Sequence, residues 1–467
     1  EIAPLEGGKT GGLARVATLR KDLQQEGKPN LALLAGDFLS PSLIGTLKKD
    51  GSRIAGAHMV DCMNAAGIDL VTFGNHEFDL SMASLQKRID ESNFEWISSN
   101  VLQNYEDGLK HRFYKMQDGQ KNYVKDTYIW EIADKDGTLA KIGFFGVTLS
   151  TFPVDYVHYE DPFLEARKAY EHLQSQCNLV LGVTHLAREQ DSLLALELPN
   201  VPLLMGGHDH ENMKFKTGNC IVAKADANAK TAYIHRIRLN TSTGKADLQS
   251  DLIALNESVG LDPLTSERVA KWYKILDETI KQVYPNPNEL IYRTAIPLEG
   301  REYKVRSEQT NLGQMVVKSM RKSVSVPVQG SFFNSGGIRI DDQLVGDVTS
   351  QDIFRVLPYG GEIFVVDIKG DLLQRVLEYS EANRGSGAYL QRDGFSFKDG
   401  KWYVGERVID KNETYTIALN DFLLKGFDIP FLIDDPKLIL KKIVPEKGSL
   451  AKDVRLGLID YLKKGGE

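Results

Sequence analysis

The stretch Leu70-Val71-Thr72-Phe73-Gly74-Asn75-His76-Glu77-Phe78-Asp79 decides the fold of this chain. It joins an apolar run, residues 70–73, to a glycine and then to a group of polar side chains. A continuous apolar run of this length is typical of a strand that is covered on both faces. The glycine allows the backbone to turn sharply where the strand ends. The stretch therefore predicts a buried strand that presents polar side chains at its carboxyl end.

Three further apolar runs end in residues that can bind a divalent cation. Leu31–Ala35 leads into Gly36-Asp37, Leu179–Thr184 leads into His185, and Val201–Met205 leads into Gly206-Gly207-His208-Asp209-His210. The carboxyl ends of neighbouring strands in such sheets converge on one crevice. We therefore expect the polar residues that follow these four strands to share a site.

Helical segments alternate with these strands. The candidates are Arg53–Ala66 and Asp161–Gln176, and a further apolar run, Ile142–Val147, predicts another strand. Asp161 is a plausible N-cap, with Pro162 at the first helical position. The alternation predicts a layered α/β domain.

A second domain follows. The length of 467 residues exceeds one ordinary core. Thr265–Val283 has the apolar stripe of one amphipathic helix, which prolines 285 and 287 stop. We expect residues 1–260 to form the first domain, residues 261–289 to form a connector helix, and residues 290–467 to form the second domain.

Composition and charge exclude some functions. A hydrophobic fraction of 42% and a charged fraction of 26% are typical of a globular protein. No apolar run approaches the length of a membrane span. The formal net charge of −7 argues against a general surface for nucleic-acid polymers. An anionic substrate would therefore have to be held by local cations.

The residues at the strand ends form a chemically consistent set of metal ligands. The candidates are Asp37, Asn75, His185, His208 and His210. Zn, Mn or Fe accept imidazole nitrogen and carboxylate oxygen together. Two such ions roughly 4 Å apart can clamp a phosphate and generate hydroxide at neutral pH. Asp37 is the candidate bridging carboxylate, and the two-residue spacing of the last two histidines puts both on one side of an extended tip.

His76 and Asp79 have a different expected role. His76 can protonate or stabilise the leaving oxygen, and Asp79 can orient its ring. Taken singly, a histidine after a strand is more often a hydrogen-bonded structural residue, and an aspartate is more often a cap or turn residue. Four such tips together favour a shared site.

The motifs resemble those of a known superfamily. Gly36-Asp37, Gly74-Asn75-His76-Glu77, His185 and Gly207-His208-Asp209-His210 are similar to successive motifs of the calcineurin-like metallophosphoesterases. With a second domain, Gly74–Asp79 resembles the 5′-nucleotidase family. The resemblance implies a four-layer α/β/β/α domain that holds two divalent ions (Zn, Mn, Fe or Co), and an α+β domain that binds the substrate and carries it to the metals.

The resemblance also implies a substrate site in the second domain. The positions similar to the family's phosphate-binding residues are Arg306, Arg339 and Asn334. Those similar to its base- and ribose-binding residues are Tyr359, Phe422 and Asp428. For each aromatic residue taken alone, core packing is the simpler interpretation.

The chain departs from the family pattern in three places. The family often has a glycine pair before the aspartate, whereas this chain has Leu423–Asp428. His210 stands where several members carry an amide. No Asp-x-His strand precedes Gly11. Since loss of a central strand would be a large defect, we expect the native protein to continue upstream of Glu1.

The leading hypothesis is hydrolysis of phosphate esters of nucleotides, with 5′-nucleotidase activity first. The enzymatic alternatives are a 2′,3′-cyclic-nucleotide phosphodiesterase and a UDP-sugar hydrolase, and the non-enzymatic alternative is an inactive nucleotide-binding protein. The family resemblance further implies export to the periplasm, the cell surface or the medium.

Overall fold

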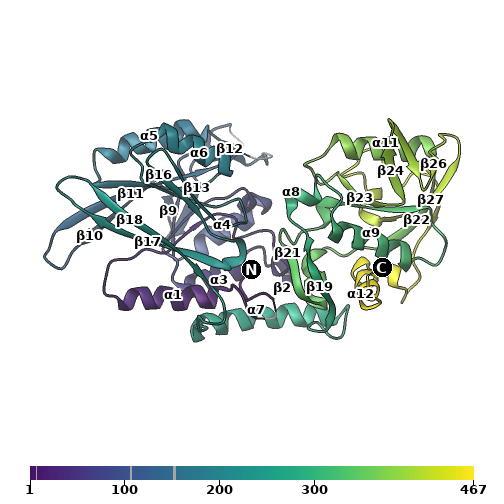
Figure 1. The fold of residues 1–467 in the computed structure, drawn as a ribbon, viewed down its shortest axis with the longest axis horizontal. Helices are drawn as coiled ribbons and strands as arrows, with labels where there is room; N and C mark the ends of the chain where they lie inside the picture. The colour runs from purple at the N-terminus through teal and green to yellow at the C-terminus, as the bar shows by residue number, and fades with distance from the viewer. Residues whose placement is uncertain (7, 106–107, 151–153, 467) are drawn as a thin grey trace. The chain divides into compact units, whose positions relative to one another are not determined.

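The computed structural model describes residues 1–6, 8–105, 108–150 and 154–466. The chain divides into two compact units, Glu1–Ile275 and Leu276–Glu467, each of which is described by itself (Figure 1). The boundary between them falls inside helix α7, Pro263–Lys281. Among the described residues, no helix has both the length and the apolar character that crossing a membrane requires.

The first unit is built on two sheets. The smaller is parallel, in the order β1 (Leu33–Ala35), β4 (Leu70–Thr72), β5 (Glu95–Ile97). The larger has the order β10 (Thr127–Ala133), β11 (Leu139–Thr148), β13 (Leu179–His185), β14 (Leu203–Gly206), β16 (Cys220–Lys224), β15 (Met213–Thr217). Its four central strands are parallel, and an antiparallel strand lies at each edge. Of the four strands that end in candidate ligands, β1 and β4 thus lie in the smaller sheet and β13 and β14 lie in the larger sheet. The four are not neighbours in a single sheet.

The two sheets pack face to face. Leu70 and Ile97 of the smaller sheet share a buried cluster with Phe144, Leu181 and Met205 of the larger. The hydroxyl of Thr148, at the end of β11, donates a hydrogen bond of 2.6 Å to the carbonyl oxygen of Phe73, just after β4. The carboxyl ends of strands from both sheets therefore meet at one edge of the sandwich.

Helices cover the outer faces of this sandwich. On one side, α5 (Pro162–Gln174) and α6 (Arg188–Glu197) bury Leu173 and Leu194 against the larger sheet. On the other side lie α1 (Leu13–Gln25) and α3 (Ala57–Ala66), which pack against each other (Figure 1). The expected α/β/β/α arrangement is confirmed. So is the start of α5, where the Asp161 side chain accepts a 2.8 Å hydrogen bond from the Leu164 amide.

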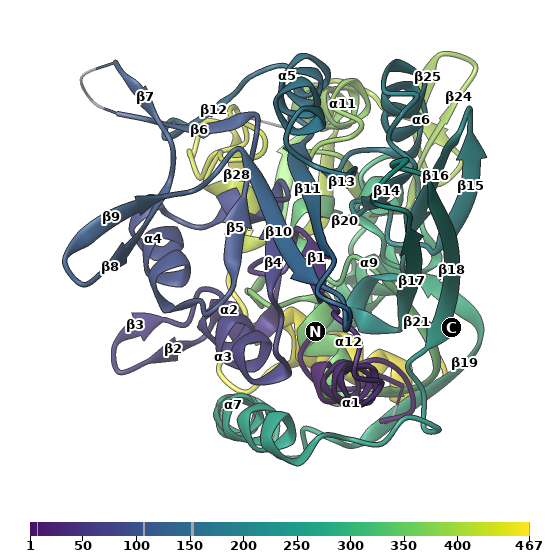
Figure 2. The same cartoon turned by 90° about the vertical axis from the view of Figure 1, so that its left-hand side faces the viewer.

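The predicted helix Arg53–Ala66 begins four residues later than expected. Ser52–Arg53 form β3, which pairs with β2 (Lys48–Lys49) in a hairpin (Figure 2). Ala55 and Gly56 then have φ angles of 42° and 82°. Because these values lie in the left-handed region, the right-handed helix starts only at residue 57.

The second unit contains a five-stranded mixed sheet. Its order is β23 (Leu390–Asp393), β20 (Gly330–Asn334), β27 (Thr414–Asn420), β22 (Ile363–Lys369), β28 (Ile439–Ile443). Helix α11 (Gly370–Ala382) buries Leu373 and Val376 against Phe332 and Ile417 of the sheet. Helix α9 (Asn311–Ser323) packs on β20 and β23 and against α12 (Val454–Lys463). This is the α+β arrangement expected for the second half.

Shorter elements complete the two units. The ribbons are β6 (Val101–Asn104) with β7 (Lys110–His111) and β12 (Val157–Tyr159), β8 (Tyr114–Gln117) with β9 (Gln120–Tyr123), β17 (Thr231–Leu239) with β18 (Ala246–Ala254), β19 (Leu290–Glu299) with β21 (Gln343–Thr349), and β24 (Phe395–Lys398) with β25 (Lys401–Val404) and β26 (Arg407–Val408). The other α-helices are α2 (Leu43–Thr46), α4 (Met82–Glu91), α8 (Glu302–Val305) and α10 (Ser350–Val356).

His58 makes the stability of the first unit sensitive to acid. Its ring is buried on α3, with Nε2 at 2.8 Å from the Ser42 hydroxyl, and burial lowers its pKa to about 3. The unfolded chain takes up this proton near pH 6.5. As pH falls from about 6.5 to about 3, His58 therefore costs the fold up to about 1.4 kcal/mol of unfolding free energy per pH unit. Above pH 6.5 it costs nothing.

We expect His58→Gln to lose less stability than the wild type between pH 7 and pH 5. Urea unfolding at a series of pH values measures the difference in slope. His111→Gln, a substitution at an exposed histidine, is the matched control. If the unfolding free energies of the wild type and of His58→Gln fall equally between pH 7 and pH 5, the acid sensitivity does not come from His58.

Candidate metal centre

Three glycines allow the strand ends to approach one another closely. A Cβ atom added at Gly74 would collide with the Asp37 carboxylate and would lie 2.7 Å from the His185 ring. At Gly207 it would collide with the carbonyl oxygen of Ala35, and at Gly36 it would collide with Gly74. The tips of β1, β4 and β14 can thus come together only where the backbone carries no side chain.

Asp37, His185 and His208 are brought together at these tips. Their ligand atoms all lie within 4.8 Å of one another. Nε2 of His185 is 2.9 Å from Asp37 Oδ2 and 3.2 Å from Asn75 Oδ1. Its Nδ1 donates a 2.6 Å hydrogen bond to the carbonyl oxygen of Ala35, which fixes the orientation of the ring. Four of the five candidate ligands therefore surround one place.

The expectation of an extended tip at His208 is wrong. The three residues whose ligand atoms converge, among those the structure describes, do not include His210. His208 has a φ of 75°, so the backbone turns between the two histidines. The alternation of an extended strand therefore does not apply across His208. The His210 carbonyl oxygen accepts a 3.1 Å hydrogen bond from the Ala227 amide.

Two of the candidate ligands have strained backbone. Asp37 and His208 have φ angles of 58° and 75°, in the left-handed region that residues with a Cβ seldom occupy. Each costs of order 1–3 kcal/mol and persists only where the surroundings impose it. Such positions cluster at functional sites.

The charges of Asp37 and the histidines shift one another's pKa values. Burial raises the pKa of Asp37, but the charges of His185 and His76 outweigh it and hold that pKa well below its usual range. Burial lowers the pKa of His185, but the Asp37 carboxylate outweighs it and raises the pKa overall. Burial, with the charge of His185, lowers the pKa of His208 to about 4. His208 is therefore a neutral imidazole at neutral pH, the form that binds a metal ion.

Glu77 holds two of the tips in place. Its buried carboxylate accepts backbone N–H bonds from Asp37 (2.8 Å), Phe38 (2.8 Å), Leu39 (3.0 Å) and Gly74 (2.6 Å). Burial and the charge of Asp37 raise the pKa of Glu77, against these hydrogen bonds. No role was predicted for Glu77, although it stands inside the decisive motif. The sequence did offer a signal: Glu77 follows Gly74 by three residues, so its carboxylate can reach back to the backbone of the turn.

A buried ion cluster supports the tip of β14. The ammonium of Lys224, on β16, lies 2.7 Å from the carboxylate of Asp191 and also pairs with Asp209. It donates a further hydrogen bond of 2.6 Å to the carbonyl oxygen of Leu186. Since Asp209 stands between His208 and His210, this cluster anchors the segment that carries both. No sequence pattern pointed to Lys224, because its partners lie on other elements.

His76 and Asp79 form the expected pair. Nδ1 of His76 is 2.9 Å from Asp79 Oδ2, and the same oxygen accepts a 2.9 Å hydrogen bond from the Ser40 hydroxyl. The backbone amide of His76 donates to Asp37 Oδ1 at 2.8 Å. The imidazole is thus fixed beside the ligand group by a carboxylate and by its own backbone.

In the second unit, the two candidate arginines share one carboxylate. Glu302, on α8, lies 2.5 Å from a guanidinium nitrogen of Arg306 and 3.7 Å from one of Arg339. Both guanidinium groups are mostly buried. A shared carboxylate brings the two cations close together, and Glu302 was absent from the predicted site.

Asn334 and Asp428 are in direct contact. Nδ2 of Asn334 donates a 2.7 Å hydrogen bond to Asp428, and its Oδ1 accepts one of 2.9 Å from buried Asn420. Burial raises the pKa of Asp428, against this hydrogen bond and the charge of Arg306. These three residues form one chain of hydrogen bonds at the ends of β20 and β27.

The candidate aromatic residues are accessible. Tyr359 is 59% exposed, and the ring of partly buried Phe422 lies 5.7 Å from that of Phe427, centre to centre. Phe427 is 72% exposed, which is unusual for a phenylalanine. It occupies the segment where the chain departs from the glycine pair. The absence of the family's glycine pair in the sequence therefore drew attention to the segment that holds Phe427. It gave no sign that Phe427 contacts Phe422.

Two family models together account for both units. One, described as calcineurin-like phosphoesterase, matches residues 9–212. The other, described as 5′-nucleotidase, C-terminal domain, matches residues 290–432. The chain belongs to the 5′-nucleotidase family of calcineurin-like phosphoesterases. As a member of this family it is a hydrolase, and the family uses divalent metal ions.

Two curated relatives show how far the similarity extends. The trifunctional nucleotide phosphoesterase protein YfkN of Bacillus subtilis is 27% identical over 89% of this chain, but over only 31% of YfkN itself. The 5′-nucleotidase of Vibrio cholerae is 26% identical over 90% of this chain and 81% of that protein. The chain thus spans about a third of the first relative and most of the second.

Solved structures share the fold. The 5′-nucleotidase precursor from Thermus thermophilus superposes with a TM-score of 0.67 at 21% identity, covering 99% of this chain and 94% of that one. The sulfate thiohydrolase SoxB from the same organism gives a TM-score of 0.64 at 15% identity, covering 98% and 81%. Both likenesses concern the fold alone.

We expect Glu77→Gln to destabilise the first unit by about 3 kcal/mol, because an amide NH₂ would face backbone N–H donors and the charge that binds them would be lost. Urea unfolding of the metal-stripped protein measures this cost directly, without a contribution from metal affinity. Glu257→Gln, at an exposed position, is the matched control. A cost no larger than that of the control would show that the four N–H bonds do not hold the tips.

Proposed function

We propose that this protein hydrolyses phosphate esters of nucleotides with divalent metal ions, and that nucleoside 5′-monophosphates are its main substrates. The observation that carries the proposal is the convergence of Asp37, His185 and His208 beside the His76–Asp79 pair. The relatives named 5′-nucleotidase support the choice of substrate class. An inactive nucleotide-binding protein would have no need of the strained backbone at Asp37 and His208.

The donor set fits a divalent metal ion. Asp37 offers carboxylate oxygen, His185 and His208 offer imidazole nitrogen, and Asn75 offers amide oxygen, all at one place. Zn, Mn, Fe and Co accept this mixture, whereas Ca or Mg sites are nearly all oxygen. We propose that these four residues, together with His210, hold two such ions. When bound, the ions supply Lewis acidity and a nucleophilic hydroxide at neutral pH.

His76 is the proposed acid for the leaving group. Asp79 faces Nδ1, so the proton available to the leaving oxygen is the one on Nε2. Protonation of the leaving oxygen prevents a high-energy alkoxide from forming as the phosphorus–oxygen bond breaks. Asp79, itself held by Ser40, keeps the ring oriented and stabilises the imidazolium form.

The second unit is proposed to hold the substrate. Arg306 and Arg339, close together through Glu302, offer guanidinium forks that match phosphate oxygens. Asn334 is proposed as a further donor to the phosphate. Exposed Tyr359 and partly buried Phe422 are the proposed stacking partners of a nucleobase, and Asp428 offers acceptors for ribose hydroxyls.

The proposed domain limits are residues 1–260 for metal binding, 261–289 for the connector and 290–467 for nucleotide binding. We also propose that the protein acts outside the cytoplasm, which is supported by a relative of known structure named as a precursor. Cell fractionation with an antibody against the chain tests this location.

We expect His76→Ala to lower kcat by about 10²–10⁴-fold, the usual contribution of a general acid, while the metal content stays unchanged. Steady-state kinetics and metal analysis by mass spectrometry on the same preparation measure the two quantities. His111→Ala, at an exposed histidine of the same unit, should keep full activity. Wild-type turnover in His76→Ala would refute the assigned role.

A substrate panel tests the ester type. We expect AMP to be cleaved with a higher kcat/KM than 2′,3′-cyclic AMP, UDP-glucose or a phosphomonoester without a base, measured with Mn, Zn and Co added in turn. Chromatography of the products gives the rates: adenosine from AMP, adenosine 2′- or 3′-monophosphate from the cyclic nucleotide, UMP from UDP-glucose, and the free alcohol from the base-free ester. A preference for the cyclic nucleotide or for UDP-glucose would favour those alternatives. Equal rates with the base-free ester would argue against base stacking by Tyr359 and Phe422.

A further inference from the structure

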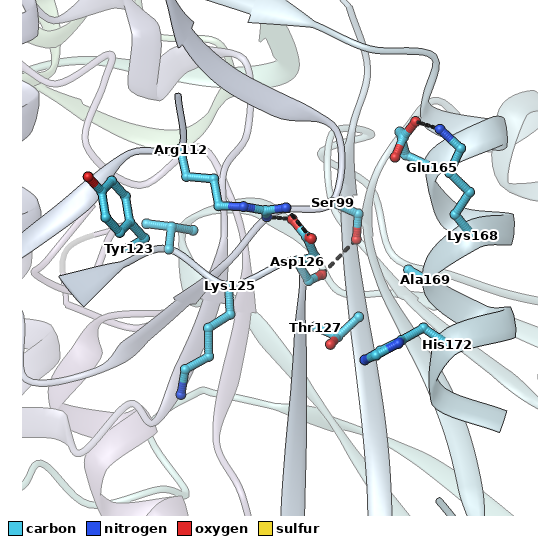
Figure 3. Close-up of a pocket in the computed structure, with 11 residues that line it drawn as sticks. Ser99, Arg112, Tyr123, Lys125, Asp126, Thr127, Glu165, Lys168, Ala169 and His172 are labelled. Carbon is cyan, nitrogen blue, oxygen red and sulfur yellow. Dashed lines mark hydrogen bonds and ion pairs between the residues drawn. The ribbon is translucent and has the colours of Figure 1, made fainter. Parts of the chain in front are cut away.

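Two cavities in the first unit lie outside the candidate metal centre. The larger, of about 650 Å³, is shown in Figure 3. Its charges largely compensate one another, because Arg112 pairs with Asp126 and Lys168 lies 2.7 Å from Glu165. Such a cavity has little net attraction for a charged ligand.

The smaller cavity, of about 420 Å³, has a different character. It lies among the β2–β3 hairpin, α4 and the part of α7 before residue 276, so that its lining residues belong to the first unit. Four of its ten lining residues are cations and one is a carboxylate. The lining consists of Lys49, Ser52, Arg53, Ile54, Ala57, Ser84, Lys87, Arg88, Glu91 and Trp272. In a chain with a net charge of −7, this is a local excess of positive charge.

Three of these cations have no carboxylate beside them. Within the described part of the chain, Lys49, Arg53 and Lys87 make no ion pair. The one carboxylate in the wall, Glu91, is 2.7 Å from the guanidinium of Arg88. The charges of the other three therefore remain available to an anion.

Arg88 adds a fixed cation to the wall. Its side chain is buried, and one guanidinium nitrogen donates to the carbonyl oxygens of Ile54 (2.7 Å) and Ala55 (3.0 Å). Its buried Nε has no acceptor among the described atoms. Hydroxyls of Ser52 and Ser84 supply further donors. A wall with many donors and positive charge suits the oxygens of a phosphate group.

We propose that this cavity binds free inorganic phosphate. The wall does not suit a nucleotide, because its aromatic residue, Trp272, is only 6% exposed and already has Lys49 Nζ at 5.3 Å from its ring centre. A nucleobase would therefore find no open ring on which to stack. The site uses no residue of the candidate metal centre and does not depend on the proposed function.

Counting bound phosphate tests the proposal. Equilibrium dialysis with radiolabelled phosphate is carried out on the full, metal-loaded chain for three proteins. These are the wild type, the cavity variant Lys49→Gln/Arg53→Gln/Lys87→Gln, and the control variant Lys28→Gln/Lys135→Gln/Lys216→Gln. The control removes the same charge from exposed lysines of the same unit that do not line the cavity. Phosphate held at the metal centre is counted equally in all three.

We expect the cavity variant to bind one phosphate fewer per chain at saturation, or to bind it at least tenfold more weakly. The control should match the wild type, and all three should have the same melting temperature because every substituted side chain is exposed. Equal phosphate counts in all three proteins, or an equal loss in the control, would overturn the proposal.

Two further measurements separate this site from the proposed activity. An uncleavable nucleoside phosphonate should displace phosphate from the metal centre but not from the cavity. If it also displaces the phosphate that the wild type binds and the cavity variant does not, the cavity takes a nucleotide and not free phosphate. Nucleotide turnover at low phosphate should be the same in the cavity variant and the wild type, so a failure of the nucleotidase proposal leaves the phosphate count intact.

Discussion

The first unit depends on one buried carboxylate that joins two strand tips. Glu77 accepts four backbone N–H bonds, three from the segment after β1 and one from Gly74 after β4. Neither tip could otherwise satisfy these buried amides, because the strands have ended and water is excluded. The same contacts bring Asp37 and Asn75 beside His185. The position of the candidate ligands is thus set by a residue that need not touch metal or substrate.

Much of the fold was predictable because its signals are local. The apolar runs before Asp37, Gly74 and His185 correspond to strands β1, β4 and β13, within two residues at each end. The start of α5 followed from the chemistry of Asp161 and Pro162 alone. The start of α3 did not, because Ala55, just after the β2–β3 hairpin, has a left-handed backbone that alanine by itself does not favour.

The sequence pointed to part of the candidate site but not to its geometry. The polar residues at strand ends were visible in the sequence, and three of them converge. The alternation of a strand was expected to place His208 and His210 on one side of an extended tip, whereas the backbone turns at His208. Lys224 and Glu302 were missed because each matters only through partners far away in the chain, such as Asp191 or Arg339. Pairings of this kind are decided by the tertiary fold, on which single-sequence patterns carry no information.

The left-handed backbone at Asp37 and His208 has a consequence for how this protein could evolve. At Asp37 a glycine would relax this strain but would also remove the ion-pair partner of His185 and the acceptor of the His76 amide. At His208 a glycine would relax the strain while removing a candidate ligand and the ring that contacts His185. Under selection for thermal endurance alone, the codon for His208 would therefore drift towards glycine more readily than the codon for Asp37.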